Sequence, residues 1–477
     1  MTDESQPSGL PPGDAVLDLL VIGGGIVGAG VAREAAMRGL GIALVEQYDY
    51  AFGTSSRSSR LLHGGLRYLA QWRLGLVREA SLEKRIIHRI APHLAQPLAF
   101  VFPTRRGSQW SKWKLSIGVK LYDLLCGGRN FGRSESLSAA ETTELLPGVN
   151  QDQLTGAVRY YDALTADARL VIDTLRSAER HGAFLASYTR LEAAERRGDH
   201  WHCTLREAAT GRARTLRVRA VVNAAGPWAD RFPQSRAQLR LTKGVHLVID
   251  RKKLPVPDAV VMPEDSRILF AIPWGERVIL GTTDTDYDGP LDAPTCEPQD
   301  IRYVLDVVGR AFPGSGIEPT DVISTWAGLR PLIAQPDGRP SDISRRHQIN
   351  EGEQGWWDVT GGKLTTYRLM GEQTVDQIIK RLGLPGGPSR TDREPLVPPR
   401  LAEGVSAIVP PPVSREVVEH YCRREWARHL DDVMIRRTSW RHYHPDHAEI
   451  AQRVAGWMAE VLGWDDAQRE QELARCR

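Results

Sequence analysis

The chain of 477 residues has no long hydrophobic run, few cysteines and almost no excess of charge of one sign. No window approaches the roughly 18 consecutive apolar residues that predict a transmembrane helix. The five cysteines are scattered and form no C-x-x-C pair. This pattern predicts no disulfide framework and fits a reducing compartment. The net charge of +3 is close to neutral, so the overall charge does not predict a nucleic-acid partner.

The sequence also lacks the signals of secretion and of metal binding. Its start has no basic segment followed by an apolar one, so we expect residues 1–15 to be a flexible tail and not a signal peptide. His442, His444 and His447 lie close together without a cysteine pair, which predicts a surface loop and no zinc site. The hydrophobic content of 41% is ordinary, so the length predicts two to four soluble domains.

The clearest positive feature is a glycine motif near the start of the chain. An apolar stretch runs into G-x-G-x-x-G within residues 19–28, and a segment of small residues follows. A second apolar run, residues 42–45, then ends on Glu46. The order is that of strand, phosphate loop, helix, strand and acid, which is the context that makes the glycines meaningful. The pattern predicts a dinucleotide site without distinguishing FAD from NAD.

Each residue of the motif has a physical reason. Gly23 allows the tight turn, Gly25 lets the backbone approach a pyrophosphate, and Gly28 lets helix and strand pack closely. The free N–H groups at the start of the helix face the anion. Glu46 can accept a hydrogen bond from a ribose hydroxyl and would repel a 2′-phosphate.

A polar loop and an amphipathic helix are predicted after the nucleotide motif. A loop dense in glycine and hydroxyl side chains, residues 53–68, comes after the second strand and precedes a helix predicted over residues 74–89. Apolar residues recur at helical spacing from Trp110 to Leu124, with lysines beside Trp110 and Trp113. This second helix either lies at a membrane interface or packs on its own domain, and the sequence alone leaves both interpretations open.

The rest of the sequence predicts a second sheet and a C-terminal helical segment. Short strands separated by turns between about residues 240 and 288 indicate an antiparallel sheet. Small residues after a buried strand at 223–228, and a glycine turn at 361–368, indicate further close approach to a ligand. Prolines between residues 395 and 412 then separate a final helical segment, which begins near Ser414.

Together these motifs resemble the FAD-dependent glycerol-3-phosphate dehydrogenases, within the D-amino-acid-oxidase-like flavoproteins. The most specific stretches are H-G-G-L-R-Y at residues 63–68 and G-G-K-L-T-T-Y-R at residues 361–368. The similarity covers about residues 16–445. Arg60 stands where a lysine is common in the family, and Val27 where a polar residue is common. No D-x-D-x-D-G loop is present, so we expect no calcium control.

The resemblance implies an α/β fold with a Rossmann-like FAD-binding domain, an inserted antiparallel-sheet substrate domain and a C-terminal helical cap. It places the FAD-binding domain at residues 16–100, 155–240 and 325–388. The substrate-binding domain then takes residues 101–154 and 241–324, and the cap takes residues 389–477.

The resemblance also implies the site residues. The candidate catalytic residues are His63 and Arg330: His63 as a general base, or Arg330 as the stabiliser of a developing alkoxide. The candidate substrate ligands are Arg67, Tyr68, Thr283, Arg330 and Lys363. The candidate FAD contacts are Gly23, Gly24, Gly25, Gly28, Glu46, Thr54, Ser55, Ser56, Ser59, His63, Gly64, Gly65, Gly226, Gly362, Lys363, Leu364 and Thr365. Lys363 is placed against either the substrate phosphate or the flavin.

The activity implied is oxidation of sn-glycerol 3-phosphate to dihydroxyacetone phosphate, with hydride transfer to FAD and electrons passed to a membrane quinone. We therefore expect a cytoplasmic protein, peripheral on the inner membrane, and the resemblance allows a homodimer. The alternatives are an oxidase that uses O₂, a flavoenzyme that oxidises a 2-hydroxy acid or an amine, and a non-catalytic FAD-binding module.

Overall fold

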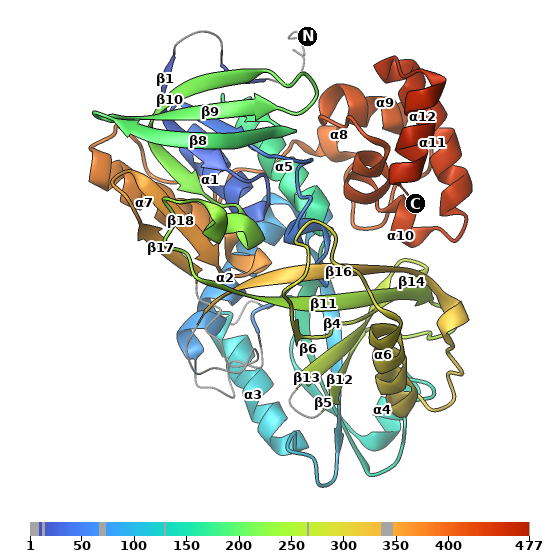
Figure 1. Ribbon diagram of the computed structural model, residues 1–477. Coiled ribbons are helices and arrows are strands. Elements are labelled where there is room, and N and C mark those ends of the chain that lie inside the picture. Colours follow the sequence, from blue (N-terminus) through green and yellow to red (C-terminus); the bar gives the residue numbers. More distant parts are fainter. Residues whose placement is uncertain are drawn as a thin grey trace.

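A computed structural model describes residues 9–11, 15–65, 73–127, 130–264, 267–334 and 347–476. The predicted tail, residues 1–15, therefore lies mostly outside the described residues. Two sheets and a bundle of helices make up the fold (Figure 1).

The first sheet is mostly parallel and holds the nucleotide motif. Its strand order is β17-β18-β10-β1-β2-β7, and the hairpin of β8 and β9 extends from β10. β1 pairs in parallel with both β10 and β2, and β17, β8 and β9 run antiparallel to their neighbours. Within the described residues, its eight strands are β1 (Val16–Ile22), β2 (Ile42–Val45), β7 (Phe184–Ala186), β8 (Thr189–Arg197), β9 (His200–Glu207), β10 (Ala213–Asn223), β17 (His347–Glu351) and β18 (Trp356–Gly361).

Helices cover one face of this sheet, and the β8–β9 hairpin covers the other (Figure 1). The central strands are therefore buried on both sides, which explains their continuous apolar runs. The covering helices are α1 (Ile26–Met37), α5 (Asp167–Arg180) and α7 (Tyr367–Leu382). Gly30 of α1 lies against the Tyr367 carbonyl of α7, where a Cβ atom would come within 2.9 Å of that oxygen. The small residues of α1 thus allow the helices to pack closely.

The second sheet is mainly antiparallel and larger. Its order is β15-β11-β14-β13-β12-β4-β6-β3, with β16 paired to β11 and β5 paired to β6. The pairing of β12 with β4 is parallel. In the part of the chain that the structure describes, its ten strands are β3 (Leu61–Leu62), β4 (Gln96–Arg105), β5 (Glu135–Leu137), β6 (Leu154–Leu164), β11 (Leu239–Asp250), β12 (Ala259–Glu264), β13 (Arg267–Trp274), β14 (Arg277–Gly281), β15 (Thr285–Asp286) and β16 (Val322–Ile333).

Helices also cover this sheet. α4 (Ala139–Leu145) and α6 (Pro298–Ala311) lie over one face, and α2 (Leu74–Ile90) and α3 (Lys112–Leu125) lie at the other (Figure 1). α3 buries Leu115, Val119 and Tyr122 and exposes the opposite side of the helix. No helix among the described residues has the length and apolar character needed to cross a membrane.

The C-terminal helices form a separate core that is joined to the first sheet by buried charges. They are α8 (Pro399–Ala402), α9 (Arg415–Arg424), α10 (Trp440–Tyr443), α11 (His447–Leu462) and α12 (Asp466–Arg475). Asp49, which follows β2, accepts hydrogen bonds from Arg436 at 2.5 Å and from Arg437 at 2.7 and 2.8 Å. Burial alone would raise the pKa of Asp49, but Arg437 and Arg436 lower it below its usual value. The carboxylate is therefore ionised and ties the cap to the nucleotide domain.

Most predicted elements are present, with two differences. The predicted helices at 74–89 and 110–124 correspond to α2 and α3, and the predicted strands lie in β11, β13 and β14. However, β3, β6, β16 and the start of β4 belong to the second sheet, although they fall in segments assigned to the FAD-binding domain. The prediction of a surface loop at His442 is wrong, because His442 is buried in α10 against Trp326.

Candidate active site

The turn between β1 and α1 explains the glycines of the first motif. Gly23 has φ of +105°, and a Cβ atom there would lie 2.6 Å from the Ala224 carbonyl oxygen. A Cβ atom at Gly28 would lie 1.9 Å from the Gly23 carbonyl oxygen, so only glycine fits. At Gly25 a Cβ atom would meet Ser55 Oγ alone, at 3.2 Å. Gly23 and Gly28 thus shape the turn, and Gly25 leaves its backbone open to a ligand.

Glu46, at the end of β2, faces this turn. Its carboxylate accepts hydrogen bonds from the Gly24 N–H at 2.7 Å and from the Tyr48 N–H at 2.9 Å. The carboxyl is surrounded by protein although the side chain retains some exposure, and this desolvation raises the pKa of Glu46 to about 7. The two N–H donors oppose the shift. Glu46 therefore changes charge near neutral pH.

The hydroxyl-rich loop folds back over the turn, as its position in the sequence suggests. Its residues 54–56 form a short 3₁₀ helix, η1 (Thr54–Ser56). Ser55 Oγ accepts a hydrogen bond from the Ile26 N–H at 3.0 Å, at the start of α1. Ser56 is buried within η1, whereas Thr54 and Ser55 face the cavities described next.

Two cavities meet at this loop. One, of about 330 Å³, follows the nucleotide turn past Gly23, Gly25 and Glu46 to Gly226. The other, of about 980 Å³, lies between the two sheets. They share a set of lining residues: Ile26, Thr54, Ser55, Gly362, Lys363 and Leu364. An elongated ligand bound along the turn can therefore extend one end into the larger cavity.

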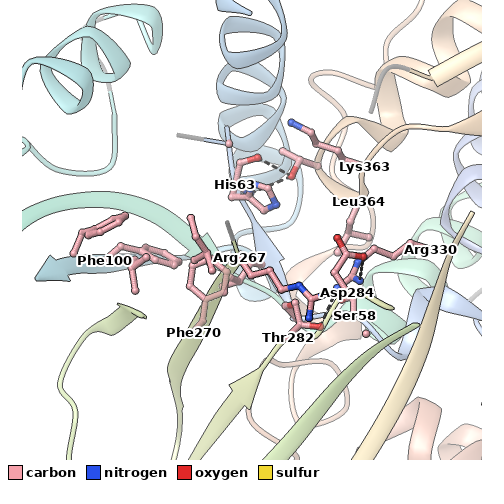
Figure 2. Close-up of a pocket in the computed structure, with 18 of the residues that line it drawn as sticks. Ser58, His63, Phe100, Arg267, Phe270, Thr282, Asp284, Arg330, Lys363 and Leu364 are labelled. Atoms are coloured by element: carbon pink, nitrogen blue, oxygen red, sulfur yellow. Dashed lines mark hydrogen bonds and ion pairs between the residues drawn. The ribbon is translucent and has the colours of Figure 1, made fainter. Parts of the chain in front are cut away.

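Arg330 lies at the polar end of the larger cavity (Figure 2). Its guanidinium donates to Asp284 Oδ1 and the Thr283 carbonyl, both at 3.1 Å, and to Thr282 Oγ1 at 2.8 Å. A Cβ atom at Gly244 would come within 2.4 Å of Arg330 Nη2. These contacts hold the guanidinium in place before any ligand arrives, and its fork suits a phosphate or carboxylate.

His63 and Lys363 enter the same cavity from other elements (Figure 2). The His63 N–H donates to Thr365 Oγ1 at 3.1 Å, and the Thr365 hydroxyl lies 3.3 Å from the His63 carbonyl. Thr365 belongs to η6 (Leu364–Thr366), directly before α7. The two specific motifs of the sequence, at 63–68 and 361–368, are thus joined at the cavity by the Thr365 hydroxyl and the His63 backbone.

His246 on β11 also lines this cavity and was missed by the sequence reasoning. Its Nε2 lies 2.8 Å from Ser59 Oγ, and its ring stacks on Trp326. Burial, followed by the charges of Arg330 and Arg60, lowers its pKa well below the usual value, so the ring is neutral. A histidine within a strand carries no local signal of function, and only the pairing of β11 with β16 brings it beside Arg330.

The other predicted site residues divide into three groups. Thr283, Ser59, Gly65, Gly362, Leu364 and Thr365 line the larger cavity. Gly24 and Gly64 line neither cavity: both are buried, Gly24 against Tyr50 and Glu46 and Gly64 against Tyr122 and Ser81. Arg67 and Tyr68 lie outside the described residues. Three further cations, Arg57, Lys114 and Arg267, line the cavity and were not predicted as site residues.

We predict that cofactor affinity depends on the ionisation of Glu46. Because burial raises its pKa to about 7, lowering the pH from 8 to 6 protonates the carboxyl and weakens its hydrogen bond to a ribose hydroxyl. Titrating FAD into the cofactor-free protein should therefore give tighter binding at pH 8 than at pH 6. The stability of the cofactor-free protein should show the opposite trend, because a raised carboxyl pKa favours folding at low pH.

The matched variant is E46Q, which keeps the shape of the side chain and removes its titration. It should bind FAD more weakly at pH 8 and show little change between the two pH values. An equally steep pH dependence in E46Q would contradict the assignment.

The comparisons with known proteins agree with this architecture. A model of the FAD dependent oxidoreductase family matches residues 18–377, and a model of the C-terminal domain of alpha-glycerophosphate oxidase matches residues 400–469. The chain is 41% identical over 374 residues to an aerobic glycerol-3-phosphate dehydrogenase of Staphylococcus aureus (strain MRSA252), covering 76% of this chain and 67% of that protein.

Solved structures show the same fold. The glycerol-3-phosphate dehydrogenase of Bacillus halodurans complexed with FAD superimposes with a TM-score of 0.77 at 26% identity, over 96% of this chain and 93% of that one. The L-alpha-glycerophosphate oxidase of Mycoplasma pneumoniae, with FAD bound, gives a TM-score of 0.62 at 16% identity, over 80% and 98%. With the nucleotide turn, the two joined motifs and the cap all present, the chain belongs to the FAD-dependent glycerol-3-phosphate dehydrogenase family.

Proposed function

We propose that this protein oxidises sn-glycerol 3-phosphate to dihydroxyacetone phosphate with FAD as the hydride acceptor, and that it passes the electrons to a membrane quinone. One observation carries the proposal. His63, Arg330 and Lys363 come from three distant motifs and face one cavity, which joins the nucleotide turn. The similarity to enzymes named glycerol-3-phosphate dehydrogenase supports the choice of substrate.

The residues of the nucleotide turn fit FAD. The turn is built from glycines whose Cβ atoms would collide with backbone, and the open backbone of Gly25 faces the smaller cavity. Glu46 lies where a ribose hydroxyl can donate to it, and Thr54, Ser55 and the 361–364 turn lie where the two cavities meet. When bound, FAD supplies the electron acceptor for the secondary alcohol.

The cations of the cavity suit the phosphate of the substrate. Arg330 is fixed by Asp284 and Thr282, and Arg267 approaches from β13 (Figure 2). A phosphate dianion requires such donors where water is scarce, because each charge-assisted hydrogen bond is stronger there. A 2-hydroxy acid offers these cations only a singly charged carboxylate, and a simple amine offers no anion, so a phosphate dianion suits them better. A non-catalytic FAD module would have no use for them.

Two histidines are candidate acceptors for the proton of the substrate hydroxyl. His63 is held at the cavity by Thr365, and we propose it as the general base. His246 is kept neutral by burial and by the charges of Arg330 and Arg60, and the same lowered pKa makes it the weaker base. Arg330 can instead stabilise a developing alkoxide, which lessens the need for a dedicated base.

We predict that R330A abolishes reduction of the bound flavin by sn-glycerol 3-phosphate while FAD remains bound. Loss of a fixed charge at the reacting end should slow the reaction by at least about 10²–10³-fold. The measurement is anaerobic mixing of the yellow protein with substrate, followed by the visible flavin band. R330K should be intermediate, because it keeps the charge and loses the fork.

The matched control is R240A on the adjacent strand β11, where Arg240 pairs with the half-exposed Asp286. It should bleach at the normal rate. Near-normal bleaching in R330A, or equal loss in R240A, would count against the assignment.

The far end of the larger cavity is apolar. Phe100 and Phe270 occupy it (Figure 2), and α3 forms part of its wall through Leu115 and Leu121. Such a surface suits a lipid-soluble acceptor better than O₂, which needs no docking site. This end supports a quinone over the oxidase alternative.

We therefore predict little hydrogen peroxide when substrate is oxidised in air without a quinone, and rapid turnover when a short-chain quinone is added. The measurement is peroxide formed per substrate consumed. Peroxide formed in a one-to-one ratio, with no stimulation by quinone, would identify an oxidase.

Helix α3 offers a surface for the membrane. Trp113, Ile117 and Leu124 are 65%, 61% and 70% exposed and account for three of the five large apolar side chains that are exposed in the described part of the chain. Lys114 and Lys120 are exposed on the same helix. Apolar side chains flanked by lysines suit a bilayer surface of anionic lipid. Ile117 also lines the cavity, so the acceptor end of the cavity lies at this helix.

We predict that the protein sediments with anionic lipid vesicles at low salt and that W113S/I117S reduces binding. Each apolar side chain is worth about 1.5–3 kcal/mol when buried, or roughly tenfold or more in affinity. V409S, which changes an exposed apolar residue outside α3, is the control and should bind normally. Binding unchanged in W113S/I117S would show that α3 does not contact the membrane.

A further inference from the structure

A buried group of charged and polar side chains lies directly behind the His63 segment and takes no part in the chemistry described above. Lys84 on α2 is fully buried, and its Nζ lies 2.7 Å from Asp162 Oδ1 on β6. The same ammonium donates to the Tyr161 carbonyl at 3.0 Å and to Asn130 Oδ1 at 3.1 Å. Its three protons are thus all used within the protein.

Tyr122 on α3 links this pair to the cavity. Its hydroxyl donates a short hydrogen bond to Asp162 Oδ1 and accepts one from the Gly64 N–H at 2.9 Å. The Gly64 N–H also lies 3.3 Å from Asp162 Oδ1. Burial, and then the charge of Asp162, raises the pKa of Tyr122 well above its usual value, so the phenol stays protonated and the direction of each bond is fixed.

The backbone of the His63–Gly64 segment is therefore held from two sides. Thr365 bonds the N–H and carbonyl of His63 from the nucleotide domain, and Tyr122 with Asp162 bonds the N–H of Gly64 from the second sheet. Space around Gly64 is equally restricted. A Cβ atom there would lie 2.3 Å from the Tyr122 hydroxyl and 2.6 Å from Ser81 Oγ.

A buried ion pair contributes little net stability, because desolvation offsets most of its attraction. What it does supply is one defined geometry, since Lys84, Asp162 and Tyr122 cannot shift without leaving a buried charge or hydroxyl without a partner. Here the network holds the backbone N–H of Gly64, the residue next to His63, which lines the cavity.

We propose that Lys84, Asp162 and Tyr122 are positioning residues, which hold the His63–Gly65 segment against the flavin and the reacting carbon of the substrate. The inference rests on the proposed function for the identity of the reaction. It predicts that loss of the Tyr122 hydroxyl slows hydride transfer while substrate affinity stays the same, because Arg330, the proposed phosphate ligand, is held by Thr282, Thr283 and Asp284 and not by Tyr122.

The experiment compares holoenzymes of the parent, Y122F and Y421F. Tyr421 is a matched control: it is also fully buried, and its hydroxyl donates to the Val405 carbonyl at 2.7 Å in the cap, outside the cavity. Anaerobic bleaching is followed over a range of sn-glycerol 3-phosphate concentrations. The visible circular dichroism of the bound flavin is recorded without substrate.

In Y122F the limiting rate should fall by about 10- to 100-fold, the range expected for a misplaced reacting group, and the half-saturating concentration should not change. The flavin dichroism should also change. Y421F should match the parent in the limiting rate and in the flavin dichroism. Equal behaviour of Y122F and Y421F, or a change in half-saturation alone, would overturn the proposal.

A second variant keeps the proposal testable if Y122F does not fold. D162N keeps the shape of the side chain and removes the charge that orients Lys84 and Tyr122, so it should alter the flavin dichroism in the same direction as Y122F. A parent enzyme that does not bleach would refute the proposed function alone, since the dichroism comparison needs no substrate. Unchanged dichroism in Y122F and D162N would refute the positioning role alone.

Discussion

The geometry of the site depends on one close contact between strand β16 of the second sheet and the η1 loop that follows the nucleotide turn. β16 passes the η1 loop so closely that a Cβ atom at Gly328 would lie 2.4 Å from the Arg57 carbonyl oxygen. The neighbouring Thr54 hydroxyl donates to the Leu329 carbonyl at 2.6 Å. Arg330 is the next residue of that strand, so its distance from the nucleotide turn is set by this contact. A side chain at 328 would collide with this carbonyl, so β16 and Arg330 would have to shift relative to the nucleotide turn.

Buried ion pairs are the second constraint on the geometry of the site, and the ion pairs of α2 are an example. Its neighbouring residues Glu83 and Lys84 form ion pairs in different directions: Glu83 with Arg368 of α7, at 2.6 and 2.8 Å, and Lys84 with Asp162 of β6. α2 is thereby attached to both domains beside the His63 segment. Arg368 belongs to the specific motif at 361–368, yet it is buried in this ion pair and serves the structure. A motif residue need not touch a ligand to be required by the site.

Local features could be predicted from the sequence. Prediction failed where segments that are distant in the sequence meet in the fold. The turn at Gly23–Gly28 follows from strand, glycine spacing and helix within one short segment, and Glu46 follows from the end of the next strand. His63, Arg330 and Lys363 could be predicted from motifs, although their convergence on one cavity is a property of the fold. His246 and Tyr122 could not be found, because one lies in an ordinary strand and the other on the buried face of an amphipathic helix. Their surroundings depend on pairings across more than 50 residues.

The same limit explains why some strands in the segments predicted for the FAD-binding domain belong to the second sheet. The start of β4 and most of β6 fall in segments assigned to the FAD-binding domain, and periodicity alone does not tell which partner a strand chooses. Their antiparallel pairing, from Gln96 with Leu164 to Arg105 with Leu154, places both in the second sheet. The loop that separates them includes α3, which therefore stands at the edge of the larger cavity.

This placement bears on how one site could serve two partners of opposite solubility. The polar end of the cavity holds Arg330 and His63, and the apolar end is walled by α3, whose outer side chains are exposed. In the proposed reaction a charged polyol phosphate arrives from water and a quinone from lipid, and both must exchange electrons with the same flavin. A single cavity with one polar and one apolar end offers each partner a surface of its own character. Tyr122 lies on the inner face of α3 and bonds Gly64, so the helix that would meet the membrane also holds the segment that carries His63.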